Sequence, residues 1–186
     1  MALFGASGYS GVEATKLLAC HPGVKLDVVT SDRWSAETVG ERLGLGGEAA
    51  RLRYVSNDLG LAAAAGVDAA VLATPADVSL KLVPALLAAG MKVVDLSGAF
   101  RLADLTLYPD AYGFVHDQEK LQSKAIYGIP ELFGAALRGA RLIASAGCYA
   151  TAAALALGPV VRAGLVAPGT IIVDALSGTT GAGRSA

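Results

Sequence analysis

Residues 5 to 11 read Gly-Ala-Ser-Gly-Tyr-Ser-Gly, and this stretch decides the fold class. A short apolar segment, 2–4, precedes it, and an amphipathic segment, 12–19, follows it. The order predicts a strand, a tight glycine turn and a helix, with Leu17 among the residues available for burial. Glycines in such a turn let the backbone approach a pyrophosphate group, which the helix N-terminus then holds. An ordinary glycine-rich turn is the alternative, and the position at the first strand-to-helix turn favours the phosphate-binding interpretation.

Strand and helix signals alternate along the rest of the chain. Thr74 and Pro75 are expected at the N-cap and first position of a helix that runs to Ala89. Segments 35–60 and 97–140 are weakly patterned and are expected to form loops with short helices. Further strands are expected at 25–30, 68–73, 92–96, 141–145 and 170–174. The pattern predicts an α/β fold with a Rossmann-type, mostly parallel sheet and helices on both faces.

Composition excludes several classes of protein. Hydrophobic residues make up 54% of the 186 positions, which suits a buried sheet. The 15 Lys and Arg residues nearly balance 16 Asp and Glu, so no nucleic-acid partner is expected. Two cysteines, Cys20 and Cys148, do not form a disulfide framework, which favours a reducing cytoplasm. No apolar run reaches membrane-spanning length, and neither a membrane partner nor a metal is expected.

Both ends of the chain suggest a longer protein. The first expected strand has only residues 1–4, and the last residues follow directly after a glycine-rich loop. We expect residues 1–147 to form a nucleotide-binding domain and residues 148–186 to begin a second, α+β domain for substrate binding and dimerisation.

Residues 145 to 151 read Ser-Ala-Gly-Cys-Tyr-Ala-Thr and predict a strand, a turn and a helix. A thiol at a helix N-terminus is favoured as a thiolate, so Cys148 is a candidate nucleophile. The alternative is a small buried hydrophobic residue, which is the interpretation for Cys20. Of the two histidines, His21 is interpreted as structural, while His116 lies in the loop region and is a possible base for the thiol.

Two further segments bear on phosphate binding. The second strand leads into Thr30-Ser-Asp-Arg33, where Asp32 would contact the ribose of NAD and Arg33 would take the 2′-phosphate of NADP, together with Ser31. The residues leave this choice open, and Arg33 is alternatively a solvated surface charge. A second glycine-rich loop, Ser177 to Gly183, is either a backbone nest for phosphate or a flexible connection.

Five motifs in order resemble those of the N-acetyl-gamma-glutamyl-phosphate reductase family, relatives of aspartate-semialdehyde dehydrogenase. The resemblance covers nearly the whole chain. Its motifs lie at 5–11, at Asp95-Leu-Ser-Gly-Ala-Phe-Arg101, at Tyr127-Gly-Ile-Pro-Glu131, at Gly147-Cys-Tyr-Ala-Thr151 and at Ser177-Gly-Thr-Thr-Gly-Ala-Gly-Arg184.

The resemblance implies an NADPH-dependent enzyme of arginine biosynthesis. Such an enzyme reduces N-acetyl-glutamyl 5-phosphate to N-acetyl-glutamate 5-semialdehyde through a thioester, here on Cys148, and is a homo-oligomer, either a dimer or a tetramer. Arg101 would pair with a substrate carboxylate or phosphate, or else form a structural ion pair. The expected cofactor-binding residues are Gly5, Ser7, Gly8, Tyr9, Ser10, Gly11, Ser31, Arg33, Thr74, Pro75, Ser97, Gly98, Ser177 and Gly178.

The sequence departs from the family at Ser145-Ala146, where the family has Asn-Pro, so one hydrogen bond and part of the oxyanion pocket would differ. The family's catalytic histidine falls beyond Ala186, and the chain alone is therefore expected to be inactive. Two alternatives remain: a related acyl-phosphate reductase of the aspartate-semialdehyde or aminoadipate type, and a non-catalytic NADP-binding redox module.

Overall fold

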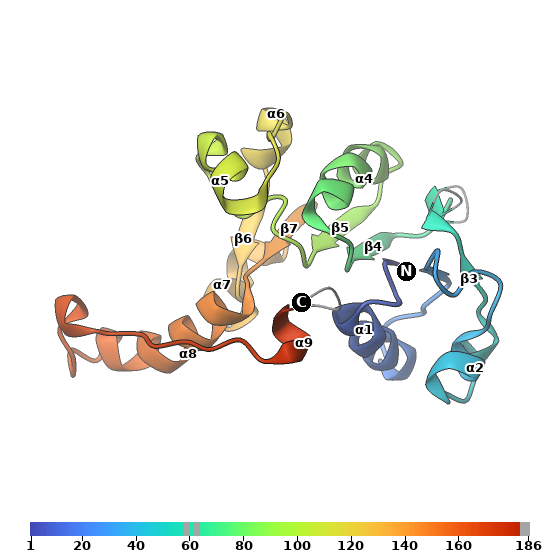
Figure 1. The fold of residues 1–186 in the computed structure, drawn as a ribbon, viewed down its shortest axis with the longest axis horizontal. Helices are drawn as coiled ribbons and strands as arrows, with labels where there is room; N and C mark the ends of the chain where they lie inside the picture. The colour runs from blue at the N-terminus through green and yellow to red at the C-terminus, as the bar shows by residue number, and fades with distance from the viewer. Residues whose placement is uncertain (58–59, 62–63, 183–186) are drawn as a thin grey trace.

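The chain folds around one parallel β-sheet in a computed structural model that describes residues 1–57, 60–61 and 64–182 (Figure 1). The strand order is β3-β2-β1-β4-β5-β7-β6, and each neighbouring pair is parallel. The strands are β1 Ala2–Phe4, β2 Val28–Thr30, β3 Tyr54–Val55, β4 Ala69–Leu72, β5 Lys92–Asp95, β6 Ile126–Gly128 and β7 Leu142–Ser145. The prediction of a Rossmann-type α/β fold is confirmed.

Helices cover both faces of this sheet, with α1 on one face and α4 on the other (Figure 1). The helices are α1 Tyr9–Cys20, α2 Val39–Leu43, α4 Ala76–Ala88, α5 Tyr108–Tyr112, α6 Glu119–Gln122, α7 Pro130–Leu137, α8 Cys148–Arg162 and α9 Thr179–Ala182. The described residues also form 3-10 turns at Ala49–Arg51, Leu105–Leu107 and Pro168–Thr170.

Alternating side chains of the strands build two hydrophobic layers. In β1, Phe4 faces a cluster that includes Val83 of α4, whereas Leu3 faces the cluster beside α1. In β4, Leu72 and Val71 divide in the same way. Successive side chains of a strand point to opposite faces, so both faces of these central strands are apolar and buried.

The chain direction across the sheet reverses between β1 and β4. From β1 the chain proceeds outward to β2 and β3, and it then returns to β4, which pairs with β1 on the other side. All strands are parallel, so their carboxyl ends lie along one edge of the sheet. Ligands of such sheets bind at this edge, beside the point of reversal.

Several local predictions were wrong. The edge strands β3 and β6 were not predicted, because two and three residues are too few to show a periodic pattern. Leu17 is 73% exposed, since it points away from the sheet on α1. Helix α4 begins at Ala76 with Pro75 at the N-cap, so Thr74 does not cap it; the Thr74 hydroxyl instead hydrogen-bonds the Ser79 hydroxyl at 2.8 Å.

The segment after α8 also differs from the prediction. Residues 171–178 form no helix or strand, and the expected strand 170–174 is wrong. Its side chains are open to solvent, with Ile172 93% exposed, because no described strand lies beside this segment to pair with it. The segment runs back along α8 and brings α9 close to α1 (Figure 1). Within the described part of the chain, no helix has both the length and the apolar character needed to cross a membrane.

Candidate active site

The glycine turn joins the carboxyl end of β1 to the N-terminus of α1. Gly5 has a φ of +79°, a conformation that suits glycine. A Cβ at Gly11 would lie 2.2 Å from the Gly5 carbonyl oxygen, so this close backbone approach requires glycine. Gly8, at the N-cap, provides no side chain to cap the helix, and the nearest atom to a Cβ there would be 3.6 Å away. The turn therefore fits a phosphate group held by the N–H groups at the head of α1.

The end of β4 packs directly against this turn. A Cβ at Gly5 would lie 2.6 Å from the Ala73 carbonyl oxygen and 3.0 Å from the Thr74 methyl carbon. This contact places Thr74 and Pro75 beside the glycine turn, at the point where the strand order reverses. Ligands of such sheets bind at this point.

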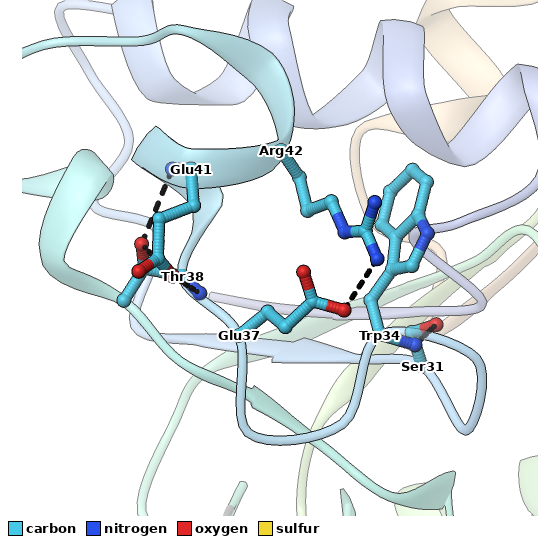
Figure 2. A network of polar contacts seen from close by, with 6 residues as sticks. All are labelled: Ser31, Trp34, Glu37, Thr38, Glu41 and Arg42. Carbon is cyan, nitrogen blue, oxygen red and sulfur yellow. Dashed lines mark hydrogen bonds and ion pairs between the residues drawn. The ribbon is translucent and has the colours of Figure 1, made fainter.

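The segment after β2 is fixed by a network of polar and aromatic contacts (Figure 2). The backbone N–H of Trp34 donates to the Ser31 hydroxyl oxygen at 3.1 Å, and the Arg42 guanidinium lies 5.3 Å from the centre of the Trp34 indole ring. Arg42 also pairs with Glu37, and a capping box of Thr38 and Glu41 begins α2 (Figure 2).

This network determines how the two candidate phosphate ligands after β2 are presented. Ser31 is buried, with its hydroxyl oxygen engaged inside the turn. Arg33 is exposed and forms no ion pair with the residues that the structure describes. Its guanidinium is therefore available to an anion.

A buried carboxylate shapes the loop after β5. Asp95 has no exposed surface, and burial raises the pKa of its carboxyl above the ordinary value of 3.8. The backbone N–H of Ser97 donates to it at 3.0 Å and the Ser97 hydroxyl donates at 2.9 Å. Ser97 therefore shapes the turn, and neither it nor Gly98, which lies under the Tyr112 ring, lines the cleft described below.

Cys148 occupies the first position of α8, directly after β7 and Gly147. The helix has 15 residues, and Gly147 provides no side-chain cap, so the first N–H groups point out beside the thiol. The thiol is exposed, which suits a nucleophile and contradicts the alternative of a buried hydrophobic residue. Cys20 is exposed as well, so its interpretation as buried is wrong.

Arg101 ties the loop after β5 to the Cys148 turn. Its Nε donates to the Ser145 carbonyl oxygen at 2.8 Å, and its Nη2 donates to the Leu96 carbonyl oxygen at 2.7 Å. Its Nη1 lies 3.1 Å from where a Cβ of Gly147 would be. Arg101 thus bonds two backbone carbonyls, forms no ion pair with a described residue, which the alternative interpretation would require, and keeps Nη1 beside the Cys148 turn.

The departure at Ser145-Ala146 has a visible consequence. The Ala146 N–H donates to the Gly128 carbonyl oxygen of β6 at 3.3 Å. A proline at this position has no N–H to donate. The turn before Cys148 therefore has one backbone hydrogen bond that a proline at position 146 would remove.

A cleft of about 890 Å³ brings these parts together. Ser10 of the glycine turn, Arg101, Tyr127 and Cys148 all line it. The carboxyl ends of β1 and β7 are three strand spacings apart, about 14 Å, so an extended ligand is needed to span from the glycine turn to the thiol. The remaining lining residues are Leu96, Leu102, Tyr112, Ser145, Ala146, Gly147, Tyr149, Ala150, Thr151, Ala152, Thr180 and Gly181.

The second glycine-rich loop reaches the same cleft through α9. Thr180 and Gly181 line the cleft, whereas the predicted residues Ser177 and Gly178 do not. Gly183 and Arg184, which end this motif, lie outside the described residues.

Neither histidine lines the cleft. His21 caps the C-terminus of α1, about 18 Å along the helix from the glycine turn. His116 is buried against Phe100 and Tyr108, and this burial lowers the pKa of its imidazole. Among the described residues, no group of three or more His, Cys, Asp or Glu side chains is arranged to hold a metal ion.

Sequence reasoning assigned no role to Tyr112 and Tyr127, which form aromatic walls of the cleft. It also gave no role to Asn57, which donates two hydrogen bonds to Asp32, a residue 25 positions away in the sequence. A pattern search could have noticed only that tyrosines are frequent in segment 97–140.

The fold and the cleft define a class: a doubly wound α/β domain in which a glycine-rich turn and a cysteine at the head of a helix share one cleft. The family model for the NAD binding domain of semialdehyde dehydrogenase matches residues 1–140, and the model for the semialdehyde dehydrogenase dimerisation domain matches residues 148–186. The chain belongs to the semialdehyde dehydrogenase family.

Curated relatives are named N-acetyl-gamma-glutamyl-phosphate reductase. The protein of Symbiobacterium thermophilum is 40% identical over 180 residues, which are 97% of this chain and 51% of the relative. That of Nitrosococcus oceani is 42% identical over 195 residues, covering 100% of this chain and 54% of the relative. The chain thus spans about half the length of the curated relatives it matches.

Solved structures of aspartate semialdehyde dehydrogenases share the fold. Enzyme II of Vibrio cholerae has a TM-score of 0.63 at 21% identity, covering 87% of this chain and 42% of its own. The Candida albicans enzyme, solved with NADP, has a TM-score of 0.57 at 15% identity, covering 87% of this chain and 46% of its own.

Proposed function

We propose that the protein reduces N-acetyl-glutamyl 5-phosphate to N-acetyl-glutamate 5-semialdehyde and phosphate, with NADPH, in cytoplasmic arginine biosynthesis. The observation that carries the proposal is the shared cleft of Ser10, Arg101 and Cys148. It joins a phosphate-binding turn to an exposed thiol, the two parts that a thioester-forming reductase needs. The name shared by the curated relatives favours this acyl phosphate over the aspartyl and aminoadipate analogues.

Cys148 is the proposed nucleophile. Its thiolate sulfur forms a bond to the acyl carbon, and phosphate leaves with the electron pair of the broken C–O bond. The N–H groups at the head of α8 stabilise the negative charge that develops on the carbonyl oxygen. NADPH, when bound, supplies the hydride that reduces the thioester carbonyl. The resulting thiohemiacetal oxyanion then re-forms a carbonyl, and the C–S bond breaks with its electron pair on sulfur, which releases the semialdehyde and restores the Cys148 thiolate.

Arg101 is the proposed substrate-binding residue, through the one guanidinium nitrogen that makes no hydrogen bond to a described carbonyl. Nη1 remains next to the Cys148 turn, where a carboxylate or phosphate oxygen can accept from it. Because Nε and Nη2 are bonded to the backbone, this nitrogen is held in a fixed direction.

The glycine turn and its neighbours are the proposed cofactor site. The head of α1 would hold the pyrophosphate, and Arg33 would pair with the 2′-phosphate, since its guanidinium is exposed and available. Thr74 and Pro75 lie where the strand order reverses and would contact the middle of the dinucleotide.

We also propose a domain boundary between residues 147 and 148 and a homo-oligomeric protein. The general base is proposed to lie outside the residues that line the cleft. The dimerisation-domain match over residues 148–186 supports the first two.

The test is a turnover assay on the full-length protein and its Cys148→Ala variant. We expect semialdehyde formation from N-acetyl-glutamyl phosphate by the wild type, and none by the variant, with NADPH binding unchanged. Normal turnover by the variant would contradict the proposal. A higher kcat/KM for aspartyl phosphate would reassign the substrate, and NADPH binding without any acyl reduction would favour a redox-sensing module.

A further inference from the structure

A single asparagine holds the acidic side chain at the end of β2. The backbone N–H of Asn57 donates to Asp32 Oδ1 at 2.7 Å, and Asn57 Nδ2 donates to Asp32 Oδ2 at 2.6 Å. Both carboxylate oxygens therefore have a donor from the same residue, which fixes the plane of the carboxylate.

The orientation of the Asn57 amide is fixed in turn by the glycine turn. The Thr30 hydroxyl donates to Asn57 Oδ1 at 2.6 Å, so Nδ2 must face Asp32. The Gly5 N–H donates to the same Thr30 hydroxyl at 3.1 Å. One chain of hydrogen bonds thus runs from the glycine turn to Asp32.

The position of Asp32 makes this arrangement significant. An acidic residue at the end of the second strand accepts hydrogen bonds from the ribose hydroxyls in NAD-binding domains, whereas an arginine there accommodates the 2′-phosphate of NADP. Here Asp32 is bound to Asn57, and its neighbour Arg33 forms no ion pair with Asp32 or with any other described residue.

We propose that Asn57 determines cofactor preference: it holds Asp32 away from the ribose and from Arg33, so that Arg33 is free to bind the 2′-phosphate of NADPH. The inference rests on the proposed function, in which the chain binds NADPH. Without Asn57, the carboxylate can accept from the ribose hydroxyls, which favours NADH, or it can pair with Arg33, which disfavours NADPH. Both outcomes change the preference in the same direction.

The experiment measures the dissociation constants of NADPH and NADH for the wild-type chain and for Asn57→Ala, Asp32→Asn and the double variant. We expect Asn57→Ala to lower the preference for NADPH over NADH by about tenfold, which corresponds to about 1.4 kcal/mol. Asp32→Asn alone is expected to leave NADH binding within twofold. In the Asp32→Asn background, Asn57→Ala is expected to have no further effect on the ratio. Asp68→Asn is the matched control, because it removes the same charge from an exposed residue at the amino end of β4, whereas Asp32 follows the carboxyl end of β2.

Three results would overturn the inference. They are a preference in Asn57→Ala within twofold of wild type, a severalfold loss of NADH binding in Asp32→Asn, and a wild-type preference for NADH. If Asn57→Ala does not fold, as judged by circular dichroism, the Asp32→Asn measurement decides alone. A wild-type chain that binds neither dinucleotide would instead refute the proposed function, and the inference with it.

Discussion

The Arg101→Lys variant tests whether Arg101 holds the Cys148 turn in position or only binds the substrate. Arginine donates to the carbonyl oxygens of Leu96 and Ser145 from two nitrogens of one planar group. A lysine ammonium carries its three donors on a single nitrogen, which cannot occupy the positions of both Nε and Nη2, so we expect it to keep only one of the two bonds. The substitution keeps the positive charge and removes one of the two bonds.

The expected loss follows from that one bond. A hydrogen bond from a charged donor contributes about 1.5–3 kcal/mol, and the partial exposure of Arg101 favours the lower part of this range, about 2 kcal/mol. For a chain of this length the midpoint of thermal unfolding should fall by about 4–8 °C. Loss of the link to Ser145 also lets the turn move, and a displacement of about 1 Å at a reacting group costs about 100-fold in rate.

The assays are urea unfolding of the chain, kcat and KM of the full-length protein, and the NADPH dissociation constant. We expect lower stability and a lower kcat, with NADPH affinity within twofold, because Arg101 makes no hydrogen bond to the glycine turn. Arg138→Lys is the control, since this exposed arginine makes no side-chain hydrogen bond to a described residue. A variant with wild-type stability and a raised KM alone would show that Arg101 only binds substrate, and would refute the positioning argument.

Three further predictions concern the turn residues and the buried histidine. Gly11→Ala places a Cβ 2.2 Å from the Gly5 carbonyl oxygen, so we expect a loss of about 3 kcal/mol in unfolding free energy and no detectable NADPH binding; an alanine variant with normal thermal unfolding would contradict this. Ala146→Pro removes the N–H that donates to the Gly128 carbonyl and should cost about 1 kcal/mol in urea unfolding, whereas a gain in stability would show that this bond contributes nothing. Burial lowers the pKa of His116 below 6.5, so its stabilising contribution, relative to His116→Gln, should be complete above pH 6.5 and lost as the pH falls through the lowered value; a constant difference between the two proteins from pH 8 to 5 would count against it.

The sequence was sufficient where structure is decided by neighbouring residues. The glycine turn, the Cys148 turn and the central strands depend on local spacing and on runs of apolar residues, and each is present in the structure at or within a few residues of its expected bounds. Resemblance to a family added the order of the five motifs, which no single pattern supplies.

The sequence was insufficient where partners are distant in the chain. Arg101 and Ser145 are 44 residues apart, and Asp32 and Asn57 are 25 residues apart. No periodic pattern in the sequence predicts these two hydrogen-bonded pairs, because their residues come together only when the strands align in the sheet. The expected strand at 170–174 has the right composition, but a strand also requires a neighbouring strand to pair with, and no described strand lies beside this segment.

Accumulation of an acyl-enzyme tests the central claim most directly. The full-length protein is incubated with N-acetyl-glutamyl phosphate in the absence of NADPH, quenched in acid and digested for mass spectrometry. The account predicts an N-acetyl-glutamyl thioester on the peptide that contains Cys148, which disappears when NADPH is added before the quench. An unmodified Cys148 peptide during active turnover, or an adduct on Cys20 alone, would contradict it.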